Sequence, residues 1–129
     1  MKNLRYFLVL STVIIYAMTA LAIKGHGVNW PAVAVNDLLS LDWRSQFDSD
    51  FIIHLLLLAA WVVWREGATA RGYLFGFLSI VMGGMFSFPY LIYASLQANG
   101  SVQALLLGTR SEQQYPTQVS GPVDAADHR

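Results

Sequence analysis

The sequence predicts an all-α membrane protein with three transmembrane helices, a short interfacial helix in the first loop and a disordered C-terminal tail. Two observations support this prediction. The chain of 129 residues is 55% hydrophobic and only 12% charged, about half the charged fraction of an ordinary soluble domain. Its apolar residues are also gathered into long runs without charge, as the hydrocarbon core of a bilayer requires.

Composition also excludes several classes of function. Eight basic residues balance eight acidic ones, so the chain lacks the basic excess that is typical of nucleic-acid-binding proteins. It contains no cysteine, which excludes disulfides, thiolate metal sites and cysteine nucleophiles. The sequence has no glycine-rich phosphate loop, metal-finger spacing or nucleophile elbow. We therefore expect no cofactor, no metal, no nucleic-acid partner and no enzymatic activity.

The first expected span covers residues 4–23, with Arg5 as its one charge. At about 1.5 Å per residue, a helix of this length matches a hydrocarbon core about 30 Å thick. A cleaved signal peptide is the alternative, because Ala20, Leu21 and Ala22 form an A-x-A motif after a basic start and an apolar core. The run extends past a usual signal core, which favours a retained span.

The second expected span covers residues 48–66 and has an uncharged centre. Asp48 or Ser49 is expected to cap the start of its helix, where an acidic group also suits the helix dipole. Trp61 and Trp64 lie near the other end, where an interfacial aromatic belt is typical.

The third expected span covers residues 72–97 and carries no charge. Its one proline lacks an N–H and is expected to kink the helix. Small residues recur along this run at intervals of about one helical turn, which predicts a face that packs closely on other spans or on a second subunit. This face consists of Gly76, Ser79, Gly83, Ser87 and Pro89.

Two further segments complete the expected membrane domain, residues 1–100. Residues 30–41 predict a short helix with Pro31 at its first position, lying flat in the membrane interface; a loop without membrane contact is the alternative. Residues 101–129 are expected to form a polar, disordered tail, because most of this segment offers little to bury.

Lysine and arginine counts beside the spans predict the orientation. Lys2, Arg5, Arg65 and Arg71 would lie on one side, and Lys24 and Arg44 on the other, with Arg110 farther along. This bias places the N-terminus in the cytoplasm and the C-terminus outside, as expected for a protein of a bacterial inner membrane.

Polar residues in the second span are the candidates for function. Asp50 and His54 are four residues apart and share a helix face with Trp61. Such a pair can act as a proton relay or ligand contact, but it can equally cap the helix and join two helices. A haem or metal at His54 would need His26 or a second copy of the chain. Capping also explains the "DSD" sequence at residues 48–50 better than a calcium loop does.

Arg65 and Glu66 form the second candidate pair, at the other end of the same span. With Arg71 they predict a local ion pair that closes the turn between two spans. Contact with an anionic headgroup or a partner protein is the alternative.

The order of these segments resembles small three-span membrane proteins, bacterial and plant, that are grouped in families of unknown function. The resemblance covers about residues 6–97 and implies a retained first span, with no activity to transfer. The matching positions are Asp50, Trp61, Trp64, Glu66, Gly83 or Gly84, Pro89, Tyr90 and Tyr93.

Two classes of function follow. The first is a non-enzymatic accessory or scaffold subunit whose partners are the lipid bilayer and either a second copy or another membrane protein. The second is an oligomeric transporter, channel or proton relay that uses Asp50, His54 and Glu66. Three spans are too few to enclose a pore, so the second class requires several copies.

Overall fold

A computed structural model describes residues 1–110, and every regular element in that range is a helix. The all-α prediction is therefore confirmed for these residues, while residues 111–129 of the expected tail lie outside them. The elements in chain order are α1 (Lys2–His26), α2 (Trp30–Leu39), α3 (Trp43–Arg65), α4 (Ala70–Met82), α5 (Gly84–Gln97), α6 (Val102–Leu107) and the short 3-10 helix η1 (Gly108–Arg110).

Helices α1 and α3 are both long and apolar enough to cross a membrane. Their 25 and 23 residues correspond to about 37 and 35 Å of helix. Almost nothing of either helix is buried: α1 buries only Leu8, and α3 buries only Ala59, Val62 and Arg65. A core helix of a soluble protein would instead have most of its apolar surface covered.

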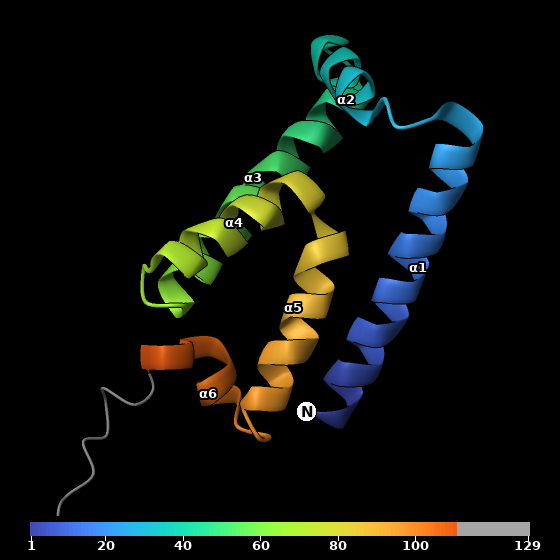
Figure 1. Ribbon diagram of the computed structural model, residues 1–129. Helices are drawn as coiled ribbons and strands as arrows, with labels where there is room; N and C mark the ends of the chain where they lie inside the picture. The colour runs from blue at the N-terminus through green and yellow to red at the C-terminus, as the bar shows by residue number, and fades with distance from the viewer. Residues whose placement is uncertain (111–129) are drawn as a thin grey trace, which may run out of the picture.

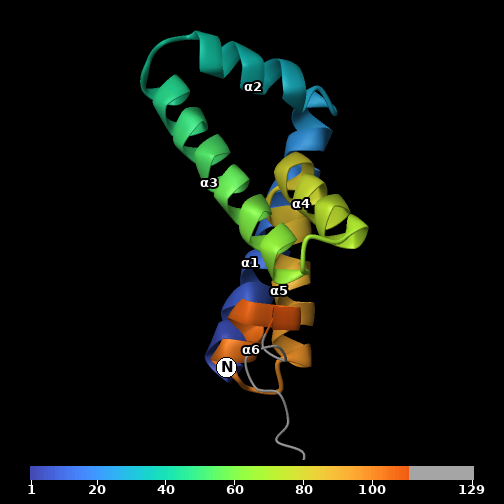
Figure 2. The same cartoon turned by 90° about the vertical axis from the view of Figure 1, so that its left-hand side faces the viewer.

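The helices form two antiparallel pairs (Figure 1). Helix α4 runs back along α3, and α5 runs back along α1. Helix α2 bridges the end of α1 and the start of α3 at one end of the molecule, and α6 lies at the opposite end near the N-terminus (Figure 2).

The expected third span is not one helix. The structure divides it at Gly83, whose φ of 53° lies in the left-handed region that glycine tolerates. The kink expected at Pro89 is therefore corrected to a break six residues earlier, and α5 continues through the proline. Because the chain reverses at Gly83, α4 and α5 together form a helical hairpin (Figure 1).

Small residues bring α4 close to α3. A Cβ added to Gly76 would lie 2.7 Å from a methyl group of Val63 and 3.2 Å from the carbonyl oxygen of Ala59. Ser79, one turn further on, is fully buried and donates its hydroxyl to the Phe75 carbonyl. The part of the expected packing face that α4 carries therefore packs on α3 of the same chain.

Hydrogen bonds join α1 to α5. Pro89 has no N–H to offer the carbonyl of Met85, four residues earlier, and the hydroxyl of Tyr16 donates to that carbonyl instead at 3.1 Å. Near the other end of the pair, Arg5 donates to the Ser95 hydroxyl at 3.2 Å and to the Ser95 carbonyl at 2.8 Å. These contacts compensate for the proline and hold the first helix on the bundle.

Helix α3 begins five residues before the expected start. Its N-cap is Asp42, whose carboxylate accepts hydrogen bonds from the backbone N–H groups of Arg44 and Ser45, so the caps expected at Asp48 and Ser49 are wrong. The Ser40 hydroxyl also donates to this carboxylate and holds the pKa of Asp42 below its usual value. An ion pair between Asp37 and Arg44 ties α2 to α3, although α2 itself buries no residue.

Residues 101–110 correct another expectation. This segment, expected to be disordered, forms α6 and η1. The Ser101 hydroxyl caps α6 by accepting from the Ala104 N–H, and Leu105 is buried. The apolar residues of this short segment are enough to fix it on the bundle, and it completes the site described next.

Candidate functional site

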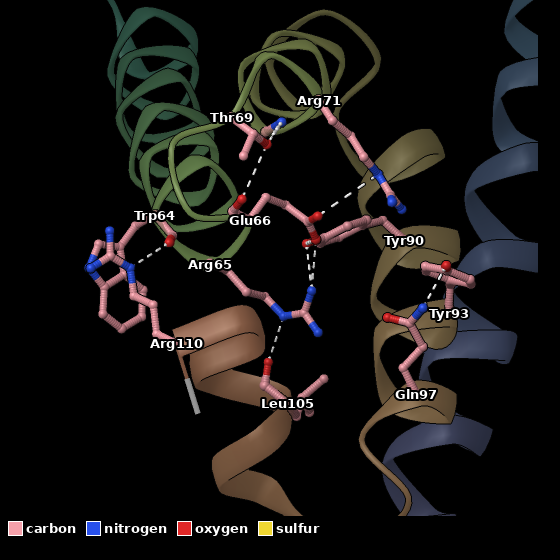
Figure 3. A network of polar contacts seen from close by, with 11 residues as sticks. Trp64, Arg65, Glu66, Thr69, Arg71, Tyr90, Tyr93, Gln97, Leu105 and Arg110 are labelled. Carbon is pink, nitrogen blue, oxygen red and sulfur yellow. Dashed lines mark hydrogen bonds and ion pairs between the residues drawn. The ribbon is translucent and has the colours of Figure 1, made fainter. Parts of the chain in front are cut away.

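A buried polar cluster lies where α3 ends (Figure 3). Its members are Arg65, Glu66, Tyr90 and the backbone carbonyl of Leu105, which we name the Arg65 cluster. Arg65 is only 4% exposed, so its guanidinium needs protein partners in place of water. Its Nε donates to the Leu105 carbonyl at 2.8 Å, and its Nη1 donates to the Tyr90 hydroxyl at 3.0 Å.

The carboxylate of Glu66 neutralises this arginine. Oε1 accepts from Arg65 Nη1 at 2.9 Å and from the Tyr90 hydroxyl at 2.7 Å. The other oxygen lies 3.9 Å from Nε of Arg71, a weak contact at the exposed edge of the cluster. Glu66 is 12% exposed, so its charge is held mainly by the two groups that donate to Oε1.

Aromatic rings surround the Tyr90 side of the cluster. The Tyr90 ring lies 5.6 Å from Phe75 and 6.0 Å from Phe86 between ring centres, and 6.5 Å from Trp61. Apolar surroundings of this kind lower the local dielectric constant and strengthen each hydrogen bond of a satisfied network.

The C-terminal segment closes the cluster from outside. Besides the Leu105 carbonyl, Arg110 donates from Nε to the Trp64 carbonyl at 3.0 Å, and its guanidinium lies 5.1 Å from the centre of the Trp64 ring. A Cβ added to Gly108 would lie 2.7 Å from the Arg65 carbonyl oxygen. The segment therefore contacts α3 through three successive points, one of which requires glycine.

The five polar residues predicted from the sequence fall into two groups. Trp61, Arg65 and Glu66 come together in or beside the Arg65 cluster. Asp50 and His54 lie at the other part of α3, since fifteen residues of helix separate positions 50 and 65 by about 22 Å.

Asp50 and His54 do not enclose a site in this chain. Nδ1 of His54 lies 2.8 Å from the backbone carbonyl of Asp50 and 3.5 Å from its carboxylate. Their side chains are 60% and 68% exposed, respectively. This geometry fits a polar pair on the outer surface of α3.

Sequence analysis missed two members of the Arg65 cluster. Tyr90 was named only among the positions that carry the family resemblance, and Leu105 was placed in the tail. Of the two arginines expected at this turn, Arg65 lies 2.9 Å from the Glu66 carboxylate and Arg71 lies 3.9 Å from it. The only signal in the sequence was the adjacent arginine and glutamate at the end of an apolar run.

The cluster is suited to structure rather than to chemistry. Among residues 1–110, every buried side-chain nitrogen and oxygen has a hydrogen-bond partner. The carboxylate of Glu66 already accepts two hydrogen bonds, one of them charge-assisted, which leaves it a poor general base. In the same part of the chain, no group of three or more His, Asp or Glu residues could hold a metal ion.

The described residues thus form an all-helical protein with two helices that could cross a membrane and a polar cluster at the C-terminal end of α3. No family model matches the sequence, and no curated protein or solved structure shows significant similarity to it. The resemblance to families of unknown function stays a prediction.

Proposed function

We propose that this chain is an integral membrane protein that acts as a non-enzymatic accessory or scaffold subunit. The proposal rests on one observation: large apolar side chains remain exposed along both long helices. They include Phe7, Leu10, Ile14, Leu57 and Ile53, each more than half exposed. Water would make such a surface prone to association, whereas a bilayer covers it.

Contacts of the first helix support a retained span. A signal peptide leaves the mature protein, but here α1 supplies Arg5 and Tyr16 to hydrogen bonds with α5. Without α1, the Met85 carbonyl that Pro89 leaves free would lose its donor within the bundle. These contacts favour a helix that stays with the protein.

The closed Arg65 cluster supports a scaffold role. Its charges pair with each other, and it joins α3, α5 and α6 into one unit. A rigid unit with exposed apolar helices offers surfaces on which other membrane helices can pack.

Membrane fractionation tests the first part of the proposal. Membranes from expressing cells would be washed with alkaline carbonate and then extracted with detergent. We expect the intact chain, including residues 4–23, to stay in the washed membranes and to enter solution only with detergent. Recovery of a monomeric chain in the aqueous fraction, or of a shorter chain that begins after Ala22, would contradict the proposal.

A flux measurement tests the scaffold role against the proton relay. The exposure of Asp50 and His54 means that a relay would need other copies to enclose them. The wild type and His54→Ala would be reconstituted in liposomes and given a pH jump. We expect both to show proton flux equal to that of empty liposomes. Flux that the wild type shows and His54→Ala lacks would favour transport and overturn the scaffold role.

A further inference from the structure

We propose that the α4–α5 hairpin is re-entrant: it enters the bilayer and returns to the same side, so that the N-terminus, the α3–α4 turn and the segment after α5 all face the cytoplasm. This inference rests on the proposed membrane location. It replaces the exterior C-terminus that a third crossing would give. Three features of the described residues lead to it.

The first feature is helix length. Helix α4 has 13 residues and α5 has 14, which correspond to about 20 and 21 Å. Neither reaches across a hydrocarbon core of about 30 Å. The apolar run is long enough to cross only as one straight helix, and the reversal at Gly83 divides it (Figure 1).

The residue at the reversal is covered by protein, and its carbonyl is paired. Non-helical backbone at membrane depth is tolerated only where protein covers it and its polar groups are paired. Gly83 is buried, and a Cβ added to it would lie 3.7 Å from Phe51 and 3.8 Å from Leu55 on α3. Its carbonyl accepts from the N–H groups of Phe86 and Ser87 and from the Ser87 hydroxyl at 2.9 Å.

The second feature is the position of the segment after α5. If residues 72–97 crossed the bilayer, Leu105 would lie about 30 Å from the end of α3. Instead, its carbonyl lies 2.8 Å from Nε of Arg65. Arg110 likewise reaches the carbonyl of Trp64 at 3.0 Å. These two contacts place the segment on the same side as the α3–α4 turn.

The third feature is the distribution of charge between the two ends of the bundle. With the hairpin folded back, one end of residues 1–110 holds five basic residues and one acidic residue, and the other holds two basic and four acidic residues. A crossing would reduce this contrast by moving Arg110 to the acidic end. The positive-inside rule therefore favours the re-entrant arrangement and places the basic end in the cytoplasm. The basic end comprises Lys2, Arg5, Arg65, Arg71 and Arg110, and the acidic end comprises Asp37, Asp42, Asp48 and Asp50.

Cysteine labelling tests the inference, because the natural chain has no cysteine. Three full-length variants would each carry one: Ala70→Cys at the α3–α4 turn, Gln103→Cys on α6 and Gly25→Cys near the end of α1. The first two positions are exposed, and a Cβ at Gly25 meets nothing within 4 Å. Intact spheroplasts and inverted membrane vesicles would be treated with a membrane-impermeant maleimide, and labelling would be compared before and after detergent.

The re-entrant arrangement predicts that Ala70→Cys and Gln103→Cys label in inverted vesicles, and that Gly25→Cys labels in spheroplasts. Labelling of Gln103→Cys together with Gly25→Cys would overturn the inference while leaving the membrane location intact. Labelling of all three variants in inverted vesicles and of none in spheroplasts would show that the chain does not cross the membrane, which would overturn the proposed function and this inference together. A variant that labels in neither preparation until detergent is added would place its position inside the bilayer and would also overturn the arrangement.

Discussion

Replacement of Arg65 by methionine is the most direct perturbation of the Arg65 cluster. Methionine keeps an unbranched apolar side chain but removes the charge and the three hydrogen bonds to Leu105, Glu66 and Tyr90. At about 1–1.5 kcal/mol per bond, their loss amounts to about 3–5 kcal/mol. Removal of one partner from a buried ion pair costs about the same, because Glu66 would keep its charge in a site that is 12% exposed.

The free energy of unfolding would be measured by titration with SDS in mixed micelles, followed by tryptophan fluorescence. Arg71→Met is the matched control, since it removes an arginine that is 56% exposed and 3.9 Å from the same carboxylate. We expect the control to cost only about 0–1 kcal/mol. Trypsin cleavage after Arg110 should also become faster in Arg65→Met, because α6 loses its anchor on α3.

A specific result would refute this reasoning. If Arg65→Met and Arg71→Met lost the same free energy of unfolding, within about 0.5 kcal/mol, the buried hydrogen bonds would have no net value. Unchanged trypsin cleavage in Arg65→Met would further show that the hydrogen bond from Arg65 is not needed to hold α6 on α3.

Three other predictions follow from the helix contacts. Gly76→Ala should lower the free energy of unfolding by about 1–3 kcal/mol, because its Cβ would lie 2.7 Å from a methyl group of α3. Gly25→Ala is the control: its Cβ would meet open space, so the change should be neutral or should stabilise the protein by up to about 1 kcal/mol. If the two variants lost the same free energy of unfolding, close packing of α4 would be contradicted. Tyr16→Phe should lower the free energy of unfolding by about 0.5–1.5 kcal/mol. The loss should be smaller in a Pro89→Ala background, because alanine restores a backbone N–H donor for the Met85 carbonyl. A double-mutant cycle without coupling would exclude this compensating role of Tyr16. Asp42 has a folded-state pKa below its ordinary 3.8, so its cap should stabilise the start of α3 above that pH and lose this effect as the pH falls through the folded-state pKa. Protection of the first amides of α3 against hydrogen exchange, relative to an unfolded chain at the same pH, should then fall with acid in the wild type but not in Asp42→Asn, and matching profiles would argue against the cap.

Composition and length were sufficient to predict the two long helices. Residues 4–23 and 48–66 combine apolar side chains with charged ends, and the structure has a helix across each. The start of α3 was missed because Asp42, Asp48 and Ser49 are all good capping residues. Only the hydrogen bonds of the folded chain distinguish Asp42 from the others.

The break in the third apolar run could not be predicted from local rules. Proline is the stronger helix breaker in general, but here Tyr16 supplies the donor that Pro89 lacks, and α5 continues. Gly83 breaks the helix because α3 and α1 hold the two halves in different places, which is a tertiary effect. The spacing of the small residues did predict a closely packed helix face. It did not indicate that this face packs on α3.

The Arg65 cluster could be anticipated only in part for the same reason. Adjacent Arg65 and Glu66 are visible in the sequence, but Tyr90 and Leu105 follow Arg65 by 25 and 40 residues. No local pattern pairs groups at these separations. The exposed pair Asp50 and His54 had the clearer spacing, yet the fold leaves it on the surface.

The distance along the chain between Arg65 and Leu105 has a consequence for synthesis. Because translation delivers the N-terminal residues first, all five of the longer helices leave the ribosome before the guanidinium meets its backbone acceptor. The contact therefore forms late, after α1 to α5 have been produced. A nascent chain stopped at residue 100 would contain Arg65, Glu66 and Tyr90 but not the segment that covers them, so protease resistance at this end would report completed assembly.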